Sequence, residues 1–137
     1  MVVIGVLLKG HQARIVTLSG TREAHIIKSQ KFNKLELPQY PTQDDVELFV
    51  QAFHAHCIKE GVDKIIINKR TTSGMGAGGA GTFLIEGVLL AVCKASIEPK
   101  HLKTITATDK KFAQLKTQRP ETKDLGVAYD LAFEGLA

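Results

Sequence analysis

The stretch IIINKRTTSGMGAGGAGTFLIEGVLLAV, residues 65–92, decides the fold class because two different hydrophobic patterns meet in it. Its β-branched start predicts a strand over 62–70, and its end predicts a helix over 82–96. A strand that leads through a short connection into a helix is the building unit of α/β proteins. The helix is apolar nearly all round, so we expect it to be deeply buried or to lie at a subunit interface.

The patterns on both sides of this stretch extend the α/β interpretation. The other predicted elements are strands over 2–10, 13–20, 24–37 and 102–107 and helices over 42–61, 108–116 and 121–137. Thr42 and Asp45 form a capping-box pattern at the start of the first helix, and Gly61 ends it. The expected order is β-β-β-α-β-α-β-α, a five-stranded mixed sheet with helices on both faces. This is the order of the ribonuclease H-like fold, and we expect one domain over 1–137.

The charge distribution is compatible with a polyanionic partner. The net charge is +4 and the pI is about 9.1. Residues 94–123 contain eight basic residues against three acidic ones, which predicts either a nucleic-acid surface or a solvated helix face. No apolar run approaches the roughly 20 residues that span a bilayer, so we expect no membrane association. Cys57 and Cys93 lie in apolar helical patterns, and free buried thiols are typical of a cytoplasmic protein.

The glycine-rich segment allows three interpretations. Its spacing matches a dinucleotide-binding fingerprint, but such a fingerprint normally opens the first βαβ unit, and here three strands precede it. A Walker loop is excluded because no Gly-Lys-Ser/Thr closes the segment. Glycines before a helix also let backbone N–H groups approach a phosphate, and the alternative to this is a loop without a ligand. The candidate phosphate-binding residues are Lys69, Arg70, Thr71, Ser73, Gly74, Gly76, Gly78 and Gly79.

Three segments in this order resemble a known family: VIGVLLKG at the start, the stretch 65–92, and ITATDKKFAQL near the end. Together they resemble a small uncharacterised bacterial family related to the Holliday-junction resolvases (RuvC-like) of the ribonuclease H-like superfamily. The resemblance covers most of the chain. It implies the ribonuclease H-like fold and, for the resolvases, cleavage of DNA with two divalent metal ions.

The resemblance implies acids at the ends of the first and fourth strands and an acidic pair on the last helix. Here Leu7 stands at the first position, and Asn68 or, by preference, Lys69 at the second. On the last helix, one register matches Asp124 and the other Asp130, and both leave Val127 without a carboxylate. Losing both strand acids should remove tight binding of two metals, so we expect no metal and no cofactor.

Three functions follow as expectations. The first is a degenerate metal site that binds nucleic acid or a phosphate ligand in a basic cleft made by Lys9, Lys69, Arg70, the glycine loop and the last helix. The second is a Mg²⁺-dependent endonuclease with a rearranged site of Glu86, Asp124 and Asp130. The third is a non-catalytic homo-oligomer that associates through the apolar helix. The expected partners are therefore DNA or RNA and a second copy of the chain, as a homodimer.

Overall fold

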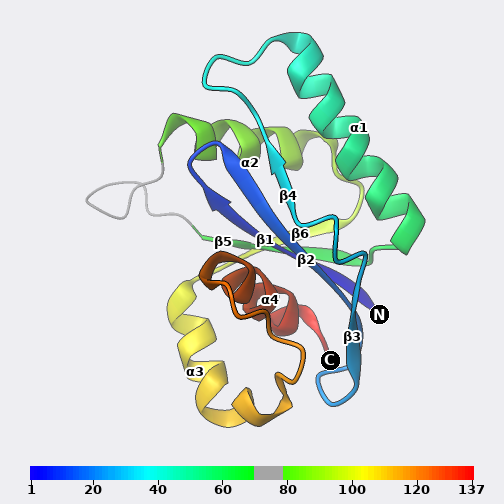
Figure 1. Cartoon of the computed structure of the whole chain (residues 1–137), viewed down its shortest axis with the longest axis vertical. Coiled ribbons are helices and arrows are strands. Elements are labelled where there is room, and N and C mark those ends of the chain that lie inside the picture. The colour runs from blue at the N-terminus through cyan, green and yellow to red at the C-terminus, as the bar shows by residue number, and fades with distance from the viewer. Residues whose placement is uncertain (70–78) are drawn as a thin grey trace.

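The computed structural model describes residues 1–69 and 79–137, which form a sheet covered by helices (Figure 1). The strands are β1 (Val2–Lys9), β2 (Gln12–Gly20), β3 (His25–Lys28), β4 (Lys34–Glu36), β5 (Lys64–Asn68) and β6 (Ser96–Lys100). The helices are α1 (Gln43–Glu60), α2 (Ala80–Val92), α3 (Leu102–Phe112) and α4 (Lys123–Gly135), with the short 3-10 helix η1 (Ala113–Leu115) before α4. The mixed α/β class that the sequence predicts is confirmed.

β1 is the central strand of the sheet. The order is β3-β2-β1-β5-β6, and β4 also pairs with β2. β1 and β2 are antiparallel, whereas β5 runs parallel to β1 and β6 runs parallel to β5. A strand inside such a sheet is covered on both faces and needs apolar residues at successive positions. This explains why residues 3–8 are all buried.

Helices cover both faces of the sheet, as expected (Figure 1). On one face, here called the α2 side, Ile4 and Ile65 pack with Phe53 of α1 and Ile85 and Leu89 of α2. On the other face, the α4 side, Val3, Leu7 and Ile66 pack with α3 and α4. Alternate strand residues point to opposite faces, so one strand supplies both cores.

Gly5 sets the distance between β1 and α4. A Cβ atom at Gly5 would lie 1.9 Å from the backbone oxygen of Ala128 and 2.5 Å from the backbone nitrogen of Ala132. Both atoms belong to the helix backbone and have no room to move. Only glycine therefore permits this close contact. The contact holds the body of α4 against the middle of β1.

The predicted strand over 102–107 is wrong, because this segment lies in α3. Its β-branched residues favour a strand by propensity, but Ile105 and Phe112 are spaced to meet the α4-side core together from one helix face. The last strand is β6 instead, which starts where the predicted helix 82–96 was expected to continue. Pro99 lowers the strand signal of this segment, yet it is tolerated because β6 lies at the edge of the sheet.

The third predicted strand, over 24–37, is divided into β3 and β4. Residues 29–33 interrupt it, and Ser29 has a left-handed backbone with φ of 49°. Among the described residues the sheet consequently has six strands rather than five.

The two helices of the α2 side differ in how well the sequence predicted them. α1 begins with the expected capping box of Thr42 and Asp45, and Gly61 ends it in the left-handed conformation. α2 buries Ile85 and Leu89 but exposes Leu90 to 59%, so of the two expectations for this helix deep burial throughout does not hold, and a subunit interface stays a prediction. Within the described residues, no helix has the length and apolar character needed to cross a bilayer.

Candidate functional site

The ends of β1 and β5 meet the beginning of α4 on the α4 side of the sheet. β1 and β5 are parallel, with Val6 opposite Ile67, so both strands end at the same edge. Asp124 lies in the first turn of α4, where a carboxylate also interacts favourably with the helix dipole. This edge is where the family resemblance places a metal site.

At this edge Asp124 is surrounded by basic side chains. Lys9 Nζ lies 3.3 Å from Asp124 Oδ1, and Arg14 Nη1 lies 3.8 Å from Asp124 Oδ2. We call these three residues the basic cluster. Lys9 is 64% exposed, whereas Arg14 and Asp124 are 23% and 25% exposed. The Nε atom of Arg14 is buried and has no hydrogen-bond partner among the described residues.

The two strand positions that would carry acids have other roles here. Leu7 is buried in the α4-side core. The side chain of Asn68 accepts a hydrogen bond from Leu8 N at 2.8 Å and donates one to Leu8 O at 3.4 Å. It therefore extends the β1–β5 ladder with its amide group. Lys69 is exposed and comes directly after the last residue of β5.

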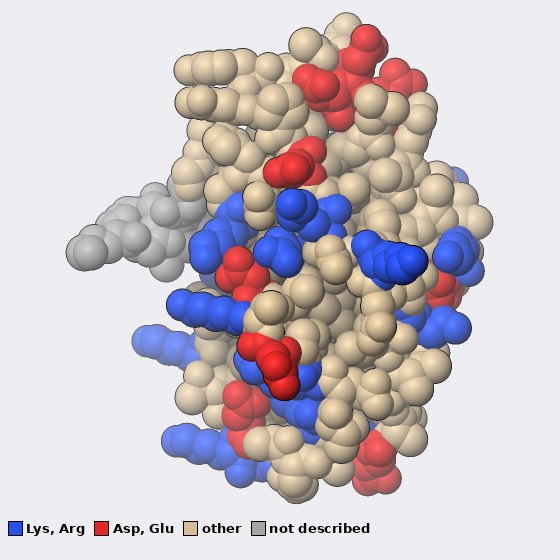
Figure 2. Space-filling model, viewed as in Figure 1, with Lys and Arg blue, Asp and Glu red and all other residues tan. Residues whose placement is uncertain are grey.

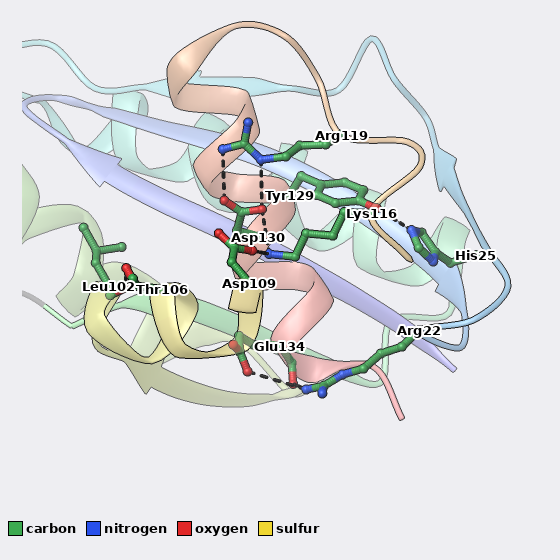
Figure 3. A network of polar contacts seen from close by, with 10 residues as sticks. All are labelled: Arg22, His25, Leu102, Thr106, Asp109, Lys116, Arg119, Tyr129, Asp130 and Glu134. Carbon is green, nitrogen blue, oxygen red and sulfur yellow. Dashed lines mark hydrogen bonds and ion pairs between the residues drawn. The ribbon is translucent and has the colours of Figure 1, made fainter. Parts of the chain in front are cut away.

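Asp130 lies in a different environment, on the side of α4 that faces α3 and η1 (Figure 3). Arg119 donates from Nε to Oδ1 and from Nη2 to Oδ2, both at 3.0 Å. Lys116 Nζ donates to Oδ1 at 3.0 Å and also contacts Asp109. Asp130 is 5% exposed and Lys116 is 4% exposed, so the centre of this ion-pair network is buried, whereas Arg119 and Asp109 reach the surface. Both carboxylate oxygens of Asp130 are already engaged.

Neighbouring polar groups reinforce the network around Asp130 (Figure 3). His25 Nδ1 lies 3.1 Å from the carbonyl oxygen of Thr21, which can only accept, so Nε2 of the neutral ring accepts the hydrogen bond of the Tyr129 hydroxyl. Burial raises the pKa of Tyr129, and the hydrogen bonds to Asp130 raise the pKa of Arg119 further above its ordinary value. Two of the eight basic residues in 94–123 are thus paired with Asp130.

Glu86 and the described end of the glycine segment lie near other elements. Glu86 is on α2, which covers the face of the sheet opposite α4, so the structure does not bring Glu86 together with Asp130. Gly79 is the N-cap of α2. The candidate residues Arg70, Thr71, Ser73, Gly74, Gly76 and Gly78 lie outside the described residues.

A contact that sequence reasoning missed joins α2 to the turn between β1 and β2. A Cβ atom at Gly81 would lie 2.3 Å from His11 Nδ1, and Thr82 Oγ1 donates to Gly10 O at 3.2 Å. The helix start is therefore docked on the turn that follows Lys9. Gly81 was a sequence signal for a close contact at this position, but the local pattern did not indicate which residue would make the contact.

Basic side chains gather on one face of the molecule (Figure 2). Figure 2 shows Lys and Arg side chains crossing the middle of this face, between the helices of the α2 side and those of the α4 side. Acidic side chains gather instead where α1 begins, which includes Asp44 and Asp45. In residues 1–69 and 79–137, no group of three or more His, Cys, Asp or Glu side chains is placed to hold a metal ion.

The strand order and the two helical layers define a ribonuclease H-like fold, which confirms the class expected from the sequence. The chain belongs to the family described as "Protein of unknown function (DUF3010)", whose model matches residues 1–135. No curated protein matches the sequence.

Two solved structures of RuvC from Thermus thermophilus are similar to this chain. One, described as a Thermus thermophilus RuvC structure, has a TM-score of 0.77 at 10% identity and covers 97% of this chain and 92% of that one. The other, RuvC in complex with Holliday junction substrate, has a TM-score of 0.72 at 12% identity and covers 97% and 90%. The resemblance to the resolvases is thus confirmed at the level of the fold.

Proposed function

We propose that this chain binds the phosphates of a nucleic acid at the basic cluster and does not cleave it. The observation that carries the proposal is the arrangement of Lys9 and Arg14 around Asp124. Two cations share one carboxylate, so the cluster keeps a net positive charge. Arg14 also has an Nε–H donor without a hydrogen-bond partner among the described residues, so Asp124 does not engage its whole guanidinium group.

The residues at this edge do not fit the metal site that the resemblance implies. Divalent magnesium requires several oxygen ligands, and carboxylates usually supply the charged ones. Leu7 has no ligand atom, and both polar atoms of the Asn68 amide bind the backbone of Leu8. Lys9 and Arg14 add positive charge beside the remaining carboxylate, which opposes a divalent cation.

The similar structures supply further support. One of the RuvC structures contains a Holliday junction substrate. At such low identity the likeness concerns the fold alone, so the nature of the nucleic acid is part of the proposal. Branched, duplex and single-stranded oligonucleotides should therefore be compared.

Fluorescence anisotropy of labelled oligonucleotides, repeated at rising salt concentrations, tests the binding. We expect binding at low salt that weakens as salt rises, because contacts to phosphates release counterions. Lys9→Gln should reduce the slope of log K against log salt by about one. The matched control is Lys94→Gln, an exposed lysine beyond the far end of α2. No anisotropy change at low salt would overturn the proposal.

The same samples with Mg²⁺ or Mn²⁺ separate binding from endonuclease activity. We expect the branched substrate to remain intact and isothermal titration with either metal to give no binding heat. Cleavage that is abolished by Asp124→Asn would instead favour the rearranged endonuclease site. Cleavage that is abolished by Glu86→Gln but not by Asp124→Asn would place the chemistry on the α2 side.

A second candidate function is self-association through α2. What supports it is the exposed apolar surface of this helix, which includes Phe83, Leu84, Leu90 and Val92. Such a surface on a soluble domain is typical of a protein interface, and two copies could pair it across a two-fold axis. Light scattering should then give a dimer that Leu90→Glu converts to a monomer, whereas a monomeric wild-type protein at micromolar concentration would exclude this candidate.

A further inference from the structure

A small pocket opens where the sheet is interrupted between β3 and β4. β2 pairs with β3 from Thr17 onward and with β4 up to Arg14. The chain crosses the gap at residues 29–33, where Ile15 N donates to Asn33 O at 2.9 Å. The pocket between these segments has a volume of about 170 Å³. We call it the β3–β4 slot.

The walls of the slot are mainly apolar. They include Ile15, Val16, Ile27, Phe32, Pro120 and Leu125. Pockets for drug-sized ligands measure about 300–1,000 Å³, so this slot is suited to a single ring system. Its rim carries Lys28 and the amide of Asn33, whose Nδ2 donates to Gln30 O and whose Oδ1 accepts no hydrogen bond among the described residues. A ring with polar edges would match such a rim.

The aromatic wall of the slot is held in place. Phe32 stacks on His56 with ring centroids 4.0 Å apart and an interplanar angle of 19°. His56 is itself fixed by a 2.8 Å hydrogen bond with Thr17 Oγ1. The sharp turn at Ser29 is secured by a 2.7 Å hydrogen bond to Glu60 on α1. The slot therefore does not depend on a ligand to order its walls.

The slot adjoins the basic cluster. Leu125 of the slot follows Asp124, and Asn33 precedes Lys34, which lies opposite Arg14 in the β2–β4 pair. Lys31 and Lys59 line a wider hollow on the far side of Phe32. An occupant of the slot would thus be flanked by cations, with phosphate-binding donors beside it. An apolar ring attached to anionic groups is the chemistry of a nucleotide.

We infer that the β3–β4 slot receives one unpaired base of the bound nucleic acid, while Lys9 and Arg14 hold the adjacent phosphates. This inference rests on the proposed function and adds to it the class of substrate. A base can enter only if it is not stacked in a duplex. The preferred substrate is therefore single-stranded or contains an unpaired base at a branch or bulge.

The test uses oligonucleotides that carry a single 2-aminopurine, with anisotropy measured on the same samples. We expect 2-aminopurine emission to rise several-fold on binding, because the base leaves its neighbours in the strand. Ile27→Phe, which fills the slot, should abolish this rise and weaken binding about tenfold, the effect of losing one stacked base. The matched control is Ile26→Phe, since Ile26 is 55% exposed and points to the opposite face of β3.

The outcomes separate the slot from the proposed function. Salt-dependent anisotropy with unchanged emission, and equal affinity for both phenylalanine variants, would overturn the slot and leave phosphate binding intact. No anisotropy change at low salt would overturn the proposed function itself. Should circular dichroism show that Ile27→Phe is unfolded, Leu125→Phe fills the same slot from α4 and is subject to the same criteria.

Discussion

The two aspartates of α4 are six residues apart, yet they lie in opposite environments. Asp130 is buried, and both of its oxygens accept hydrogen bonds from Arg119 and Lys116. Asp124 is partly exposed, and its partners Lys9 and Arg14 keep donors to spare. Asp130 and its partners hold α3 and η1 against α4, whereas the cluster around Asp124 remains open to an anion from solvent.

This difference shows why an acid cannot be assigned a role from its place in a motif. Six residues correspond to 600° around a helix, so the two side chains leave α4 in different directions. Asp124 points toward the end of β1, while Asp130 points toward Arg119 (Figure 3). The register that matched Asp130 to a resolvase acid selects a residue whose contacts are internal to the fold.

The largest effect that we expect is on stability. Asp130→Asn should lower the free energy of unfolding by about 3 kcal/mol, because it leaves the buried Lys116 without its buried counterion and weakens the ion pair with Arg119. Asp124→Asn, the matched control, should cost less than about 1 kcal/mol, as expected for a more exposed pair. Urea unfolding curves give both values. Equal losses would mean that the two environments do not differ as described.

The second prediction compares the same substitution at the two arginines, Arg14 beside Asp124 and Arg119 beside Asp130. Arg14→Gln should weaken oligonucleotide binding by about tenfold, since it removes a charge-assisted contact to phosphate. Arg119→Gln should leave binding unchanged but reduce stability by about 2 kcal/mol, the value of a hydrogen bond to a charged group. Anisotropy and urea unfolding are measured on both variants. A loss of binding in Arg119→Gln, with stability retained, would reverse the roles that we assign.

The third prediction concerns the sign of a mutation at Asp124. Removing its charge frees Lys9 and Arg14 from their ion pairs, so Asp124→Asn should increase affinity for an oligonucleotide by about threefold at low salt. The gain should shrink as salt rises, because screening weakens the repulsion between Asp124 and phosphate. A loss of affinity would indicate that Asp124 itself contacts the ligand, for example through a metal ion.

The smallest expected effect belongs to Tyr129, next to Asp130. Burial raises its pKa in the folded state, so its neutral form stabilises the fold fully below the unfolded pKa of about 10. This stabilisation is lost as pH rises from about 10 toward the folded pKa. Tyr129→Phe should cost about 1 kcal/mol at neutral pH through the lost hydrogen bond to His25 and should flatten the decline above pH 10. If the free energy of unfolding of Tyr129→Phe declined above pH 10 as steeply as that of the wild type, this prediction would be contradicted.

Much of the fold could be predicted because its signals are local. Thr42 with Asp45 marks the start of α1, and Gly61 marks its end, within a few residues of chain. The apolar run of β1 likewise indicates a central strand. The prediction of a strand over 102–107 was wrong because the β-branched residues of this segment favour a strand locally. The helical spacing of Ile105 and Phe112 matters only once the α4-side core exists.

The site was less predictable because its contacts join distant residues. Lys9 was a candidate on grounds of charge, but nothing local indicated that Arg14 would share Asp124 with it. No sequence motif around Asn68 indicates that its side chain forms a hydrogen bond with the backbone of Leu8. The sequence could therefore predict which carboxylates were absent from the strand ends and that Lys9 was a candidate cation, but it could not predict that Arg14 stands at that edge.

The contact between Gly5 and α4 also constrains when the protein can fold during synthesis. Lys9 and Asp124 are 115 residues apart, so at about 5–20 residues per second a ribosome adds α4 roughly ten seconds after β1. Until then the α4 side of the sheet, including Val3, Leu7 and Ile66, lacks the residues of α4 that form most of its core. The nascent chain should need shielding over this interval, and pauses in translation before α4 should favour aggregation.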